Sequence, residues 1–302
     1  MKLFAATVAA AVAQGFKRSS QQIEETFVIV PEGYGGSFEG FNATQVVLEN
    51  AEDDLFREFE DEFYAVDIDQ MSRSQFTEEE KKMIRKFKLI KNMIVYLQQI
   101  KLFGKFCFYG CYCFAKGPRN LLVPGGNTAP MDGADSACKR HLQCNECSKL
   151  DFGETCSATD PYNFIAKQDE VTGIAWIQCV DEEGSCARAL CECDKALAYD
   201  LSDAEREWNI LHHAKWGNFD LEMNCVRVGG GGADRGERFN EPSAMECCGK
   251  YPRRYPFRAD DGYGNIKQCC VSDTGYGKSY NPMRLECCAR DGSLKGIGSC
   301  DE

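Results

Sequence analysis

Long apolar runs and basic stretches are scarce in this chain of 302 residues. After the first 13 residues, no apolar run approaches the roughly 20 residues that span a bilayer, so we expect no transmembrane segment. The formal net charge is -12, and residues 21–80 hold 17 Asp and Glu against two Arg, a net of -15. The acidity therefore belongs to one segment. It argues against nucleic acid as a partner, because the phosphate backbone would repel that segment.

Cysteine is absent from residues 14–76 but reaches 19 in the whole chain. The N-terminal stretch MKLFAATVAAAVAQ contains one lysine, an apolar run and the small-x-small triplet Ala11-Val12-Ala13. This pattern predicts a secretory signal peptide over residues 1–13. We therefore expect a secreted, extracellular protein whose cysteines form disulfides.

Four regions are expected after the signal peptide. Residues 14–76 are interpreted as an acidic pro-segment or arm, with VPEGYGGSFEGFN as a loop and an N-glycosylation sequon at Asn42. Residues 77–226 hold 12 of the cysteines and are interpreted as the main domain. Residues 227–244 include four consecutive glycines and are predicted to be a flexible linker. Residues 245–302 hold the remaining seven cysteines and are interpreted as a separate module.

The strongest helix pattern begins at Thr77, which forms a capping box with Glu80. Apolar residues then recur at intervals of three and four and predict one buried stripe, which consists of Met83, Phe87, Ile90, Ile94 and Leu97. The other face carries the basic residues Arg85, Lys86, Lys88 and Lys91. We expect this face to be solvated; contact with anionic lipid or with the acidic arm are the alternatives.

A second capping box, Ser202 with Glu205, predicts another helix over SDAEREWNILHHAKW. Within this stretch His212 and His213 are adjacent, so on a helix their side chains point about 100° apart and cannot both face one metal. We interpret both as exposed helix residues.

Three motifs, in the expected order, resemble the secreted phospholipase A2 family. YGCYC stands at residues 109–113, PMDGADSACKRHLQC at residues 130–144 and CECDKALA at residues 191–198, all behind the amphipathic first helix. The resemblance covers roughly residues 84–226. It implies a mainly α, disulfide-rich fold, with a core of antiparallel helices and a small β-wing, to which the cysteine-rich tail module is added.

The family's disulfide pairing, transferred to this chain, implies five bridges. They are Cys113–Cys138, Cys144–Cys193, Cys156–Cys186, Cys179–Cys191 and Cys111–Cys225. A further family bridge is absent at both ends, because its two positions are Ala137 and Asp200. Cys107 and Cys147 are left over and could pair with each other.

By the same resemblance, His141 is the general base that activates a water molecule, and Asp194 orients its imidazole. In the family, calcium polarises the ester carbonyl and stabilises the oxyanion. Here the carboxylate that should follow the histidine is replaced by Leu142, which has no side-chain oxygen.

Backbone carbonyls would have to supply the remaining calcium ligands, and the candidates are those of Tyr112, Phe114 and Lys116. Phe114 replaces the first glycine of the family's loop, and Asn145 stands where the family has a tyrosine. We therefore expect calcium binding to be doubtful and the pair of His141 and Asp194 to be vestigial or weak.

The tail repeats paired cysteines about every 20 residues, at 247–248, 269–270 and 287–288. Such spacing predicts small loops held by disulfides rather than by a hydrophobic core. Its motifs resemble the paired-cysteine modules of galaxin-like extracellular-matrix proteins. Seven is an odd number, so one thiol is expected to be free or to pair between chains, which would give a disulfide-linked oligomer.

Three functions remain open. The first, which we favour, is a matrix or scaffold protein that uses a catalytically impaired phospholipase A2-like domain and binds extracellular-matrix components. The second is a calcium-dependent secreted phospholipase A2 that hydrolyses the sn-2 ester at phospholipid surfaces. The third is a pseudoenzyme that binds a lipid or a receptor. The tail favours the first, His141 and Asp194 the second, and the basic helix face the third.

Overall fold

The structure is a computed structural model that describes residues 30–38, 77–98, 103–117, 120–169, 171–226, 245–260 and 264–300. The predicted signal peptide over residues 1–13, the sequon at Asn42 and the predicted linker over residues 227–244 lie outside these ranges. In the part of the chain that is described, no helix has both the length and the apolar composition that crossing a membrane requires.

The predicted first helix is confirmed as α3 (Glu78–Gln98). Its capping box is formed as expected: the Thr77 N–H donates to Glu80 Oε2 at 2.9 Å, and the Glu80 N–H donates to Thr77 Oγ1 at 3.2 Å. Phe87, Ile90 and Ile94 of the predicted stripe are buried in the core. The helix thus begins at its capping signal and packs through its apolar stripe.

The expectation of a solvated basic face on α3 is wrong for two of its four residues. Lys86 is 0% exposed and Lys91 is 2% exposed. Arg85, by contrast, forms an ion pair with Glu32 of the N-terminal arm, one of the alternatives that the sequence left open. The buried stripe is therefore wider than the apolar residues alone suggest.

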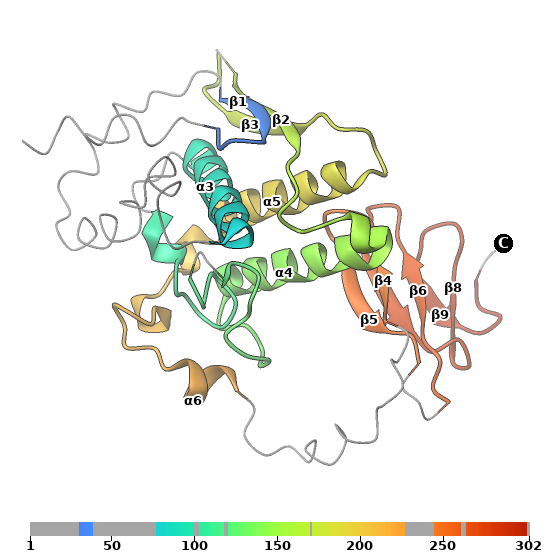
Figure 1. Cartoon of the computed structure of the whole chain (residues 1–302). Helices are drawn as coiled ribbons and strands as arrows, with labels where there is room; N and C mark the ends of the chain where they lie inside the picture. Colours follow the sequence, from blue (N-terminus) through green and yellow to red (C-terminus); the bar gives the residue numbers. More distant parts are fainter. Residues whose placement is uncertain are drawn as a thin grey trace, which may run out of the picture.

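Two long helices, α4 (Gly133–Phe152) and α5 (Cys186–Asp203), form the centre of the domain (Figure 1). The Asp132 carboxylate caps α4 and the Ser185 hydroxyl caps α5, each accepting a backbone N–H of the first turn. Cys144 bonds to Cys193, whereas Arg140, one turn earlier, contacts Asp200. Residue numbers thus fall along α4 as they rise along α5 from one contact to the next, so the two helices are antiparallel.

The helix predicted from Ser202 is wrong, because α5 already contains this residue and ends at Asp203. The chain continues as the 3-10 turns η5 (Ala204–Glu207) and η6 (Ile210–His212), and α6 (Leu221–Cys225) follows. The helix does not continue because this stretch forms hydrogen bonds with residues 103–110. That segment begins with the 3-10 turn η2 (Phe103–Phe106). The Trp208 indole N–H donates to the Lys105 carbonyl, and the Gly110 N–H donates to the His212 carbonyl, both at 2.8 Å.

A small sheet of three strands has the order β1-β2-β3 (Figure 1). Strands β2 (Asn163–Gln168) and β3 (Ala175–Cys179) are antiparallel and form the predicted wing; the 3-10 turn η4 (Gly153–Thr155) follows α4 before them. Strand β1 (Gly35–Phe38) pairs in parallel with β2. The stretch VPEGYGGSFEGFN is therefore not only a loop as predicted, because its middle adds a strand to the wing.

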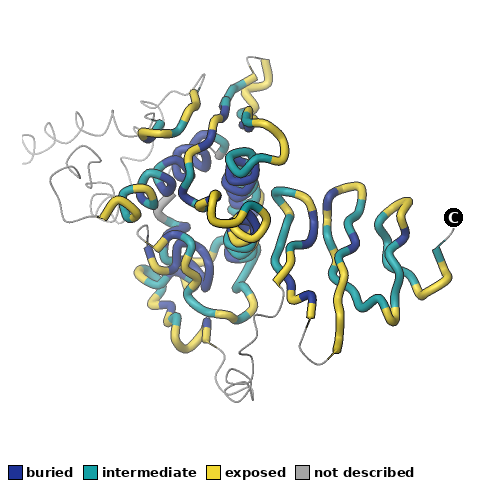
Figure 2. The backbone as a smooth tube through the Cα atoms, turned by 45° about the vertical axis from the view of Figure 1, so that its right-hand side comes forward, coloured by how far each residue is buried: buried dark blue, intermediate teal, exposed yellow. Residues whose placement is uncertain are grey.

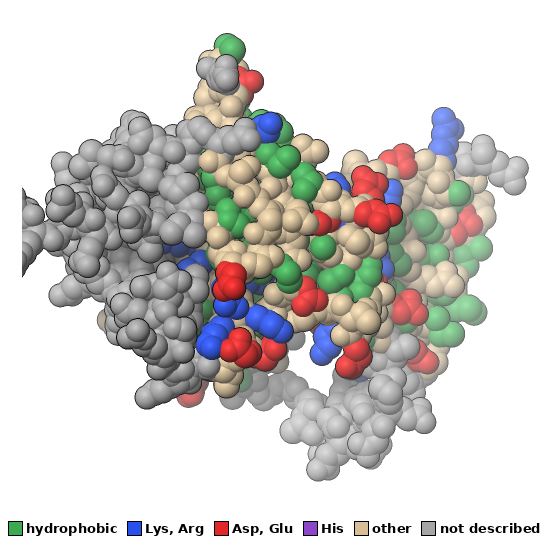
Figure 3. Space-filling view, turned by 45° about the horizontal axis from the view of Figure 1, so that its top comes forward, with side chains coloured by type: hydrophobic (Ala, Val, Ile, Leu, Met, Phe, Trp, Pro, Cys, Tyr) green, Lys and Arg blue, Asp and Glu red, His purple; other side chains and the backbone are tan. Residues whose placement is uncertain are grey.

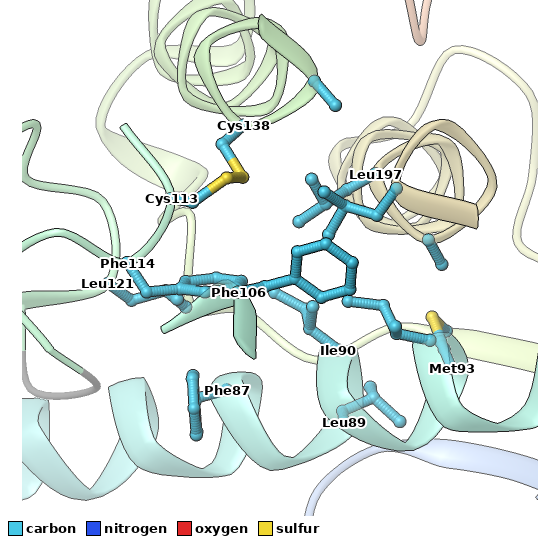
Figure 4. Close-up of a cluster of buried hydrophobic side chains, with 14 of the residues drawn as sticks. Phe87, Leu89, Ile90, Met93, Phe106, Cys113, Phe114, Leu121, Cys138 and Leu197 are labelled. Atoms are coloured by element: carbon cyan, nitrogen blue, oxygen red, sulfur yellow. A yellow bond between two sulfur atoms is a disulfide. The ribbon is translucent and has the colours of Figure 1, made fainter. Parts of the chain in front are cut away.

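The core lies where α3, α4 and α5 meet residues 106–117 and 120–121, and buried residues are concentrated there (Figure 2). In Figure 4, Phe87, Ile90 and Met93 of α3 face Phe106, Phe114, Leu121 and Leu197 across this centre, beside the Cys113–Cys138 disulfide. Fully burying side chains of this size stabilises the fold by roughly 1.5–3 kcal/mol each.

All five bridges that the resemblance implies are present in the structure: Cys113–Cys138, Cys144–Cys193, Cys156–Cys186, Cys179–Cys191 and Cys111–Cys225. The suggested pair of Cys107 and Cys147 is not formed, because Cys147 bonds to Cys247 of the tail. Cys107 itself is buried in the core.

The tail consists of three two-stranded hairpins, which lie side by side beyond α4 (Figures 1 and 2). Their strands are β4 (Met245–Cys248), β5 (Tyr255–Arg258), β6 (Gln268–Val271), β7 (Gly277–Tyr280), β8 (Leu285–Cys287) and β9 (Leu294–Gly296). Their bridges are Cys248–Cys269, Cys270–Cys287 and Cys288–Cys300. Among the described tail residues, Cys248, Phe257 and Ala259 form a small buried cluster, and Cys270 and Cys288 are buried at their own bridges, as expected for loops held by disulfides.

The odd cysteine of the tail is accounted for within the chain, because Cys247 bonds to Cys147 of α4. The expectation of a free thiol or a bridge between chains is therefore wrong for the tail. Helices dominate the core and strands make up the tail, so the molecule is a disulfide-rich assembly of helices and small sheets rather than mainly α throughout.

Candidate active site and its altered metal loop

His141 of α4 and Asp194 of α5 face each other, as the motifs predicted. His141 Nε2 lies 2.8 Å from Asp194 Oδ1, and the two residues are 4% and 0% exposed. The adjacent Cys144–Cys193 bridge fixes the two helices at this level. The Tyr162 hydroxyl, just before β2, donates to Asp194 Oδ2 at 2.8 Å. One carboxylate thus orients the imidazole and also accepts a phenol, a partner that the motifs did not reveal.

A buried cation also contacts this carboxylate. Lys86 Nζ of α3 lies 3.1 Å from Asp194 Oδ1 and donates to Asn145 Oδ1 at 3.0 Å. Asn145, which stands where the family has a tyrosine, donates in turn to the His141 carbonyl at 2.9 Å. The residue at the expected tyrosine position therefore links Lys86 to the backbone of His141.

Sequence reasoning placed Lys86 on the wrong face, although a signal was present. Lys86 is three residues after Met83 and four before Ile90, so helical spacing puts it on the flank of the buried stripe. Basic side chains are almost never fully buried without a partner. The motif CECD predicted only that Asp194 orients His141; the structure shows that its carboxylate is buried and is also the partner of Lys86.

The three titratable groups His141, Asp194 and Lys86 shift one another's pKa values. Burial lowers the pKa of His141, and the nearby Lys86 charge lowers it further against the opposing effect of Asp194. Burial alone would raise the pKa of Asp194, but Lys86 and the hydrogen bonds from His141 and Tyr162 hold it below its ordinary value. Burial also lowers the pKa of Lys86, which Asp194 partly offsets. The lowered pKa values of His141 and Asp194 favour a neutral imidazole beside an ionised carboxylate, which the Lys86 side chain also contacts.

The neighbouring metal position is built differently. Leu142 is partly buried and packs against the core, so an apolar side chain occupies the place of the family's carboxylate. The Phe114 ring is buried and contacts Phe87 edge to face, with the ring centroids 5.4 Å apart. The Phe114 carbonyl, one of the three candidate ligands, accepts the N–H of Phe108 at 3.3 Å and that of Gly117 at 2.9 Å.

These residues do not fit calcium. The ion takes six to eight oxygen ligands, usually with carboxylates among them. Leu142 offers no oxygen, the Phe114 carbonyl is engaged in turn hydrogen bonds, and the Lys116 side chain is exposed with a positive charge. The Tyr112 backbone N–H donates to Asp135 Oδ1, and its carbonyl would be one neutral oxygen in such a site. Among the described residues, no three His, Cys, Asp or Glu side chains are grouped so as to hold a metal ion.

A buried carboxylate anchors the start of this loop. Asp135 of α4 accepts the backbone N–H groups of Cys111 at 3.1 Å, Tyr112 at 2.8 Å and Met131 at 2.9 Å. Gly110 has φ +55°, and a Cβ there would lie 2.3 Å from the Asp135 carboxyl carbon, so only glycine fits. Burial raises the pKa of Asp135, although these three hydrogen bonds oppose the shift.

The two adjacent histidines are not exposed helix residues, which corrects that interpretation. His212 Nδ1 lies 2.8 Å from Asp132 Oδ2, so it supports the residue that caps α4. His213 is 0% exposed and stacks on Trp216 with the ring centroids 4.0 Å apart. Both positions have structural contacts, and the two side chains do not converge on a common site.

A groove of about 760 Å³ opens beside the altered metal position. Leu142 and Asn145 of α4 line it together with Leu122, Pro124 and Ala158. Lys139 and Lys149 also line it, and the Lys139 ammonium lies 4.9 Å from the centre of the Tyr112 ring. Glu146 and Glu154 line it as well, so the groove beside Leu142 combines apolar walls with charges of both signs.

Comparison with known proteins agrees with the geometry. The family model for phospholipase A2 matches residues 87–210. The group IID secretory phospholipase A2 of Mus musculus is 30% identical over 127 residues, which are 42% of this chain and 76% of that protein. The acidic phospholipase A2 beta-bungarotoxin A6 chain of Bungarus multicinctus is 30% identical over 127 residues, 41% of this chain and 75% of that one. This chain belongs to the phospholipase A2 family.

Proposed function

We propose that this protein keeps the phospholipase A2 fold but has lost calcium-dependent hydrolysis, and that it acts outside the cell as a matrix or scaffold module. The observation that carries the proposal is the Lys86 ammonium, buried 3.1 Å from Asp194 Oδ1. The same oxygen contacts His141 Nε2. A lysine therefore shares the carboxylate that should support the catalytic base.

This sharing weakens the base for an electrostatic reason. When a histidine accepts a proton from water, the neighbouring carboxylate stabilises the imidazolium that forms. Here Lys86 already neutralises that carboxylate, and its own charge opposes a second cation in a buried site. The pKa of His141 is lowered, as this repulsion and the burial of the imidazole require. We infer that His141 accepts a proton poorly.

The metal loop supports the same proposal. Without a carboxylate at Leu142, a dication would be coordinated only by neutral oxygens, and its affinity would fall. Oxyanion stabilisation of the kind that such an ion supplies is worth roughly 10² to 10³ in rate. A weakened base and a missing electrophile together favour an impaired site with His141 and Asp194 as vestiges.

The scaffold role rests on how the tail joins the domain. Besides the Cys147–Cys247 bridge, Asp151 of α4 accepts the Tyr251 hydroxyl at 2.7 Å and both Arg254 Nε at 2.5 Å and Arg254 Nη2 at 2.9 Å. The bidentate geometry gives a defined orientation. The tail hairpins are joined to one another and to α4 by disulfides, which form and persist in the oxidising extracellular space. The resemblance of the tail to galaxin-like matrix modules adds to this proposal.

A second candidate is the lipid- or receptor-binding pseudoenzyme, which the groove beside Leu142 favours. Leu122, Pro124 and Leu142 give it apolar walls, and Lys139 and Lys149 suit the anionic group of an amphiphile, while Glu146 and Glu154 of the same lining oppose that charge. In this reading the fold binds a phospholipid-like ligand without hydrolysing it. The third candidate, an active phospholipase A2, is favoured only by the contact of His141 with Asp194.

A lipolysis assay separates these candidates. Vesicles of phosphatidylglycerol and phosphatidylcholine would be incubated with the protein, with millimolar calcium or with chelator, and fatty acid release would be measured. We expect the same background rate in both media and in the His141→Ala variant. Calcium-dependent release that His141→Ala abolishes would refute the proposal. Vesicle co-sedimentation without release, lost in Leu142→Asp, would favour the pseudoenzyme.

A further inference from the structure

The N-terminal arm contributes a short extended segment, residues 30–38, that is bound along the wing. Strand β1 pairs in parallel with β2, with Gly35 opposite Asn163 and Phe38 opposite Ala166. The Gly35 N–H donates to the Tyr162 carbonyl at 3.2 Å. The edge of β2, which would otherwise offer unpaired backbone groups, is thereby covered by a piece of the same chain.

Two aromatic side chains of the segment are seated on aromatic partners. The Phe38 ring lies 5.3 Å from that of Tyr96 on α3 and 5.2 Å from that of Phe164 on β2, measured between centroids. The Tyr34 ring contacts that of Tyr162 edge to face at 5.1 Å. Aromatic pairs in this geometry are favourable beyond the area that they bury. The segment therefore bridges α3 and the wing.

Close packing restricts which segment can occupy this edge. A Cβ at Gly36 would lie 2.2 Å from the Phe164 ring, and one at Gly35 would lie 1.9 Å from Asn163 Oδ1. Both positions thus require glycine or a shift of the Asn163 and Phe164 side chains. Glu32, ion-paired to Arg85 at 3.0 Å, adds a polar contact at the other end. The bound sequence has the form aromatic, two glycines, one small residue, aromatic.

The segment also lies next to the candidate active site. Tyr34 contacts Tyr162, whose hydroxyl donates to Asp194. The Tyr34 hydroxyl is buried and has no hydrogen-bond partner among the described residues. Burial raises the pKa of Tyr34, and the nearby Asp194 charge adds to this shift. The ring is thus held by packing against the residue that supports the carboxylate.

We propose that the outer edge of β2, with Tyr96, Tyr162 and Phe164, is a peptide-binding surface whose resident ligand is residues 30–38. The partner class is an extended peptide with the aromatic-Gly-Gly-small-aromatic pattern, added to the sheet as a parallel strand. The segment remains part of the protein when the chain between it and α3 is cut. The arm therefore contains a permanent piece of the fold, whatever happens to the rest of it.

Cleavage of the full chain tests this directly. A specific protease site would be introduced between residues 39 and 76, and the cut protein would be passed through gel filtration at micromolar concentration. No cysteine precedes Cys107, so no disulfide can retain the N-terminal fragment. We expect the fragment to co-elute with the remainder. Elution of the two pieces apart, with the disulfides of the remainder intact, would overturn the proposal.

Two variants and a matched control sharpen the test. Gly36→Val places a side chain against the Phe164 ring, and Phe38→Ala removes the ring that contacts Tyr96 and Phe164. Both variants should therefore release the fragment after cutting. Ser37→Ala, an exposed position of the same strand, should retain it. Equal retention in all three variants would also contradict the proposal. Because fragment retention is measured without lipid or calcium, its outcome is independent of the proposed loss of hydrolysis.

Discussion

His141 and Leu142 are neighbours on one helix, yet their surroundings differ: polar groups hydrogen-bonded to one another surround His141, whereas Leu142 packs among apolar side chains. On the His141 side, the imidazole, the Tyr162 phenol and the Lys86 ammonium all contact Asp194, and every one of these groups is buried. On the Leu142 side, an apolar side chain packs beside a loop whose carbonyl at Phe114 is used in turns. The contact between His141 and Asp194 is therefore present although the next residue, Leu142, offers no oxygen to a metal.

The difference follows from what holds each side in place. Helix packing and the Cys144–Cys193 bridge fix the His141 side, so its contacts persist whatever chemistry they serve. The Leu142 side depends on a loop that is anchored to α4 through Asp135 and the Cys113–Cys138 bridge. None of these anchors involves the side chain of Leu142, so the proposed loss of the metal site is compatible with an intact fold. The predictions below test the two sides separately.

The largest effect is expected on the His141 side, from Lys86→Met. The change leaves the Asp194 carboxylate buried without its cation, and breaking a buried pair in this way costs about 3–5 kcal/mol of folding free energy. Denaturant unfolding at neutral pH measures it. Lys82→Met is the matched control on the same helix, because Lys82 is solvent-exposed, and should change stability by less than about 0.5 kcal/mol. Equal stability of the two variants would show that the buried pair does not form.

On the loop side, we expect a loss of stability from Phe114→Ala and a smaller difference in stability between Phe114→Ala and Phe114→Gly. Phe114→Ala removes a buried ring and should cost about 3–5 kcal/mol. Phe114 has φ 45°, a left-handed backbone conformation that glycine adopts without strain. Phe114→Gly should therefore be more stable than Phe114→Ala by about 1 kcal/mol. Paired unfolding curves measure the difference, and the opposite order would argue against this loop conformation.

A smaller effect is expected from pH. Since the pKa of His141 is below its ordinary 6.5 in the folded state, the unfolded chain binds that proton more readily. This contribution to stability is complete above about pH 6.5 and is lost as the pH falls, by at most about 1.4 kcal/mol per pH unit for one proton. Unfolding free energies between pH 7.5 and 5 would measure the slope. His141→Asn should flatten it, and an unchanged slope would assign the effect to other groups.

Local patterns in the sequence were enough for the elements that short-range physics determines. The capping box at Thr77 and the spacing of Phe87, Ile90 and Ile94 located α3, and the motif residues His141 and Asp194 are brought together. These signals depend on residues a few positions apart or on motifs whose order is fixed. The structure agrees with them closely.

Contacts between distant segments could not be read in the same way. The burial of Lys86 depends on a carboxylate that follows it by more than 100 positions, and the Cys147–Cys247 bridge has a sequence separation of 100. Residues 35–38 form a strand only because β2 offers them an edge. Each of these features requires knowledge of which surfaces meet, and composition or periodicity alone does not supply it.

The central claim, that the metal site is lost while the fold is kept, is tested most directly by calcium titration in a calorimeter with the intact protein and its Leu142→Asp variant. We predict no saturable binding by the unaltered chain from micromolar to low millimolar calcium, because no carboxylate stands at the metal position. A gain of binding in Leu142→Asp would locate the defect at this residue. Saturable binding by the unaltered chain, together with calcium-dependent fatty acid release that requires His141, would contradict the account.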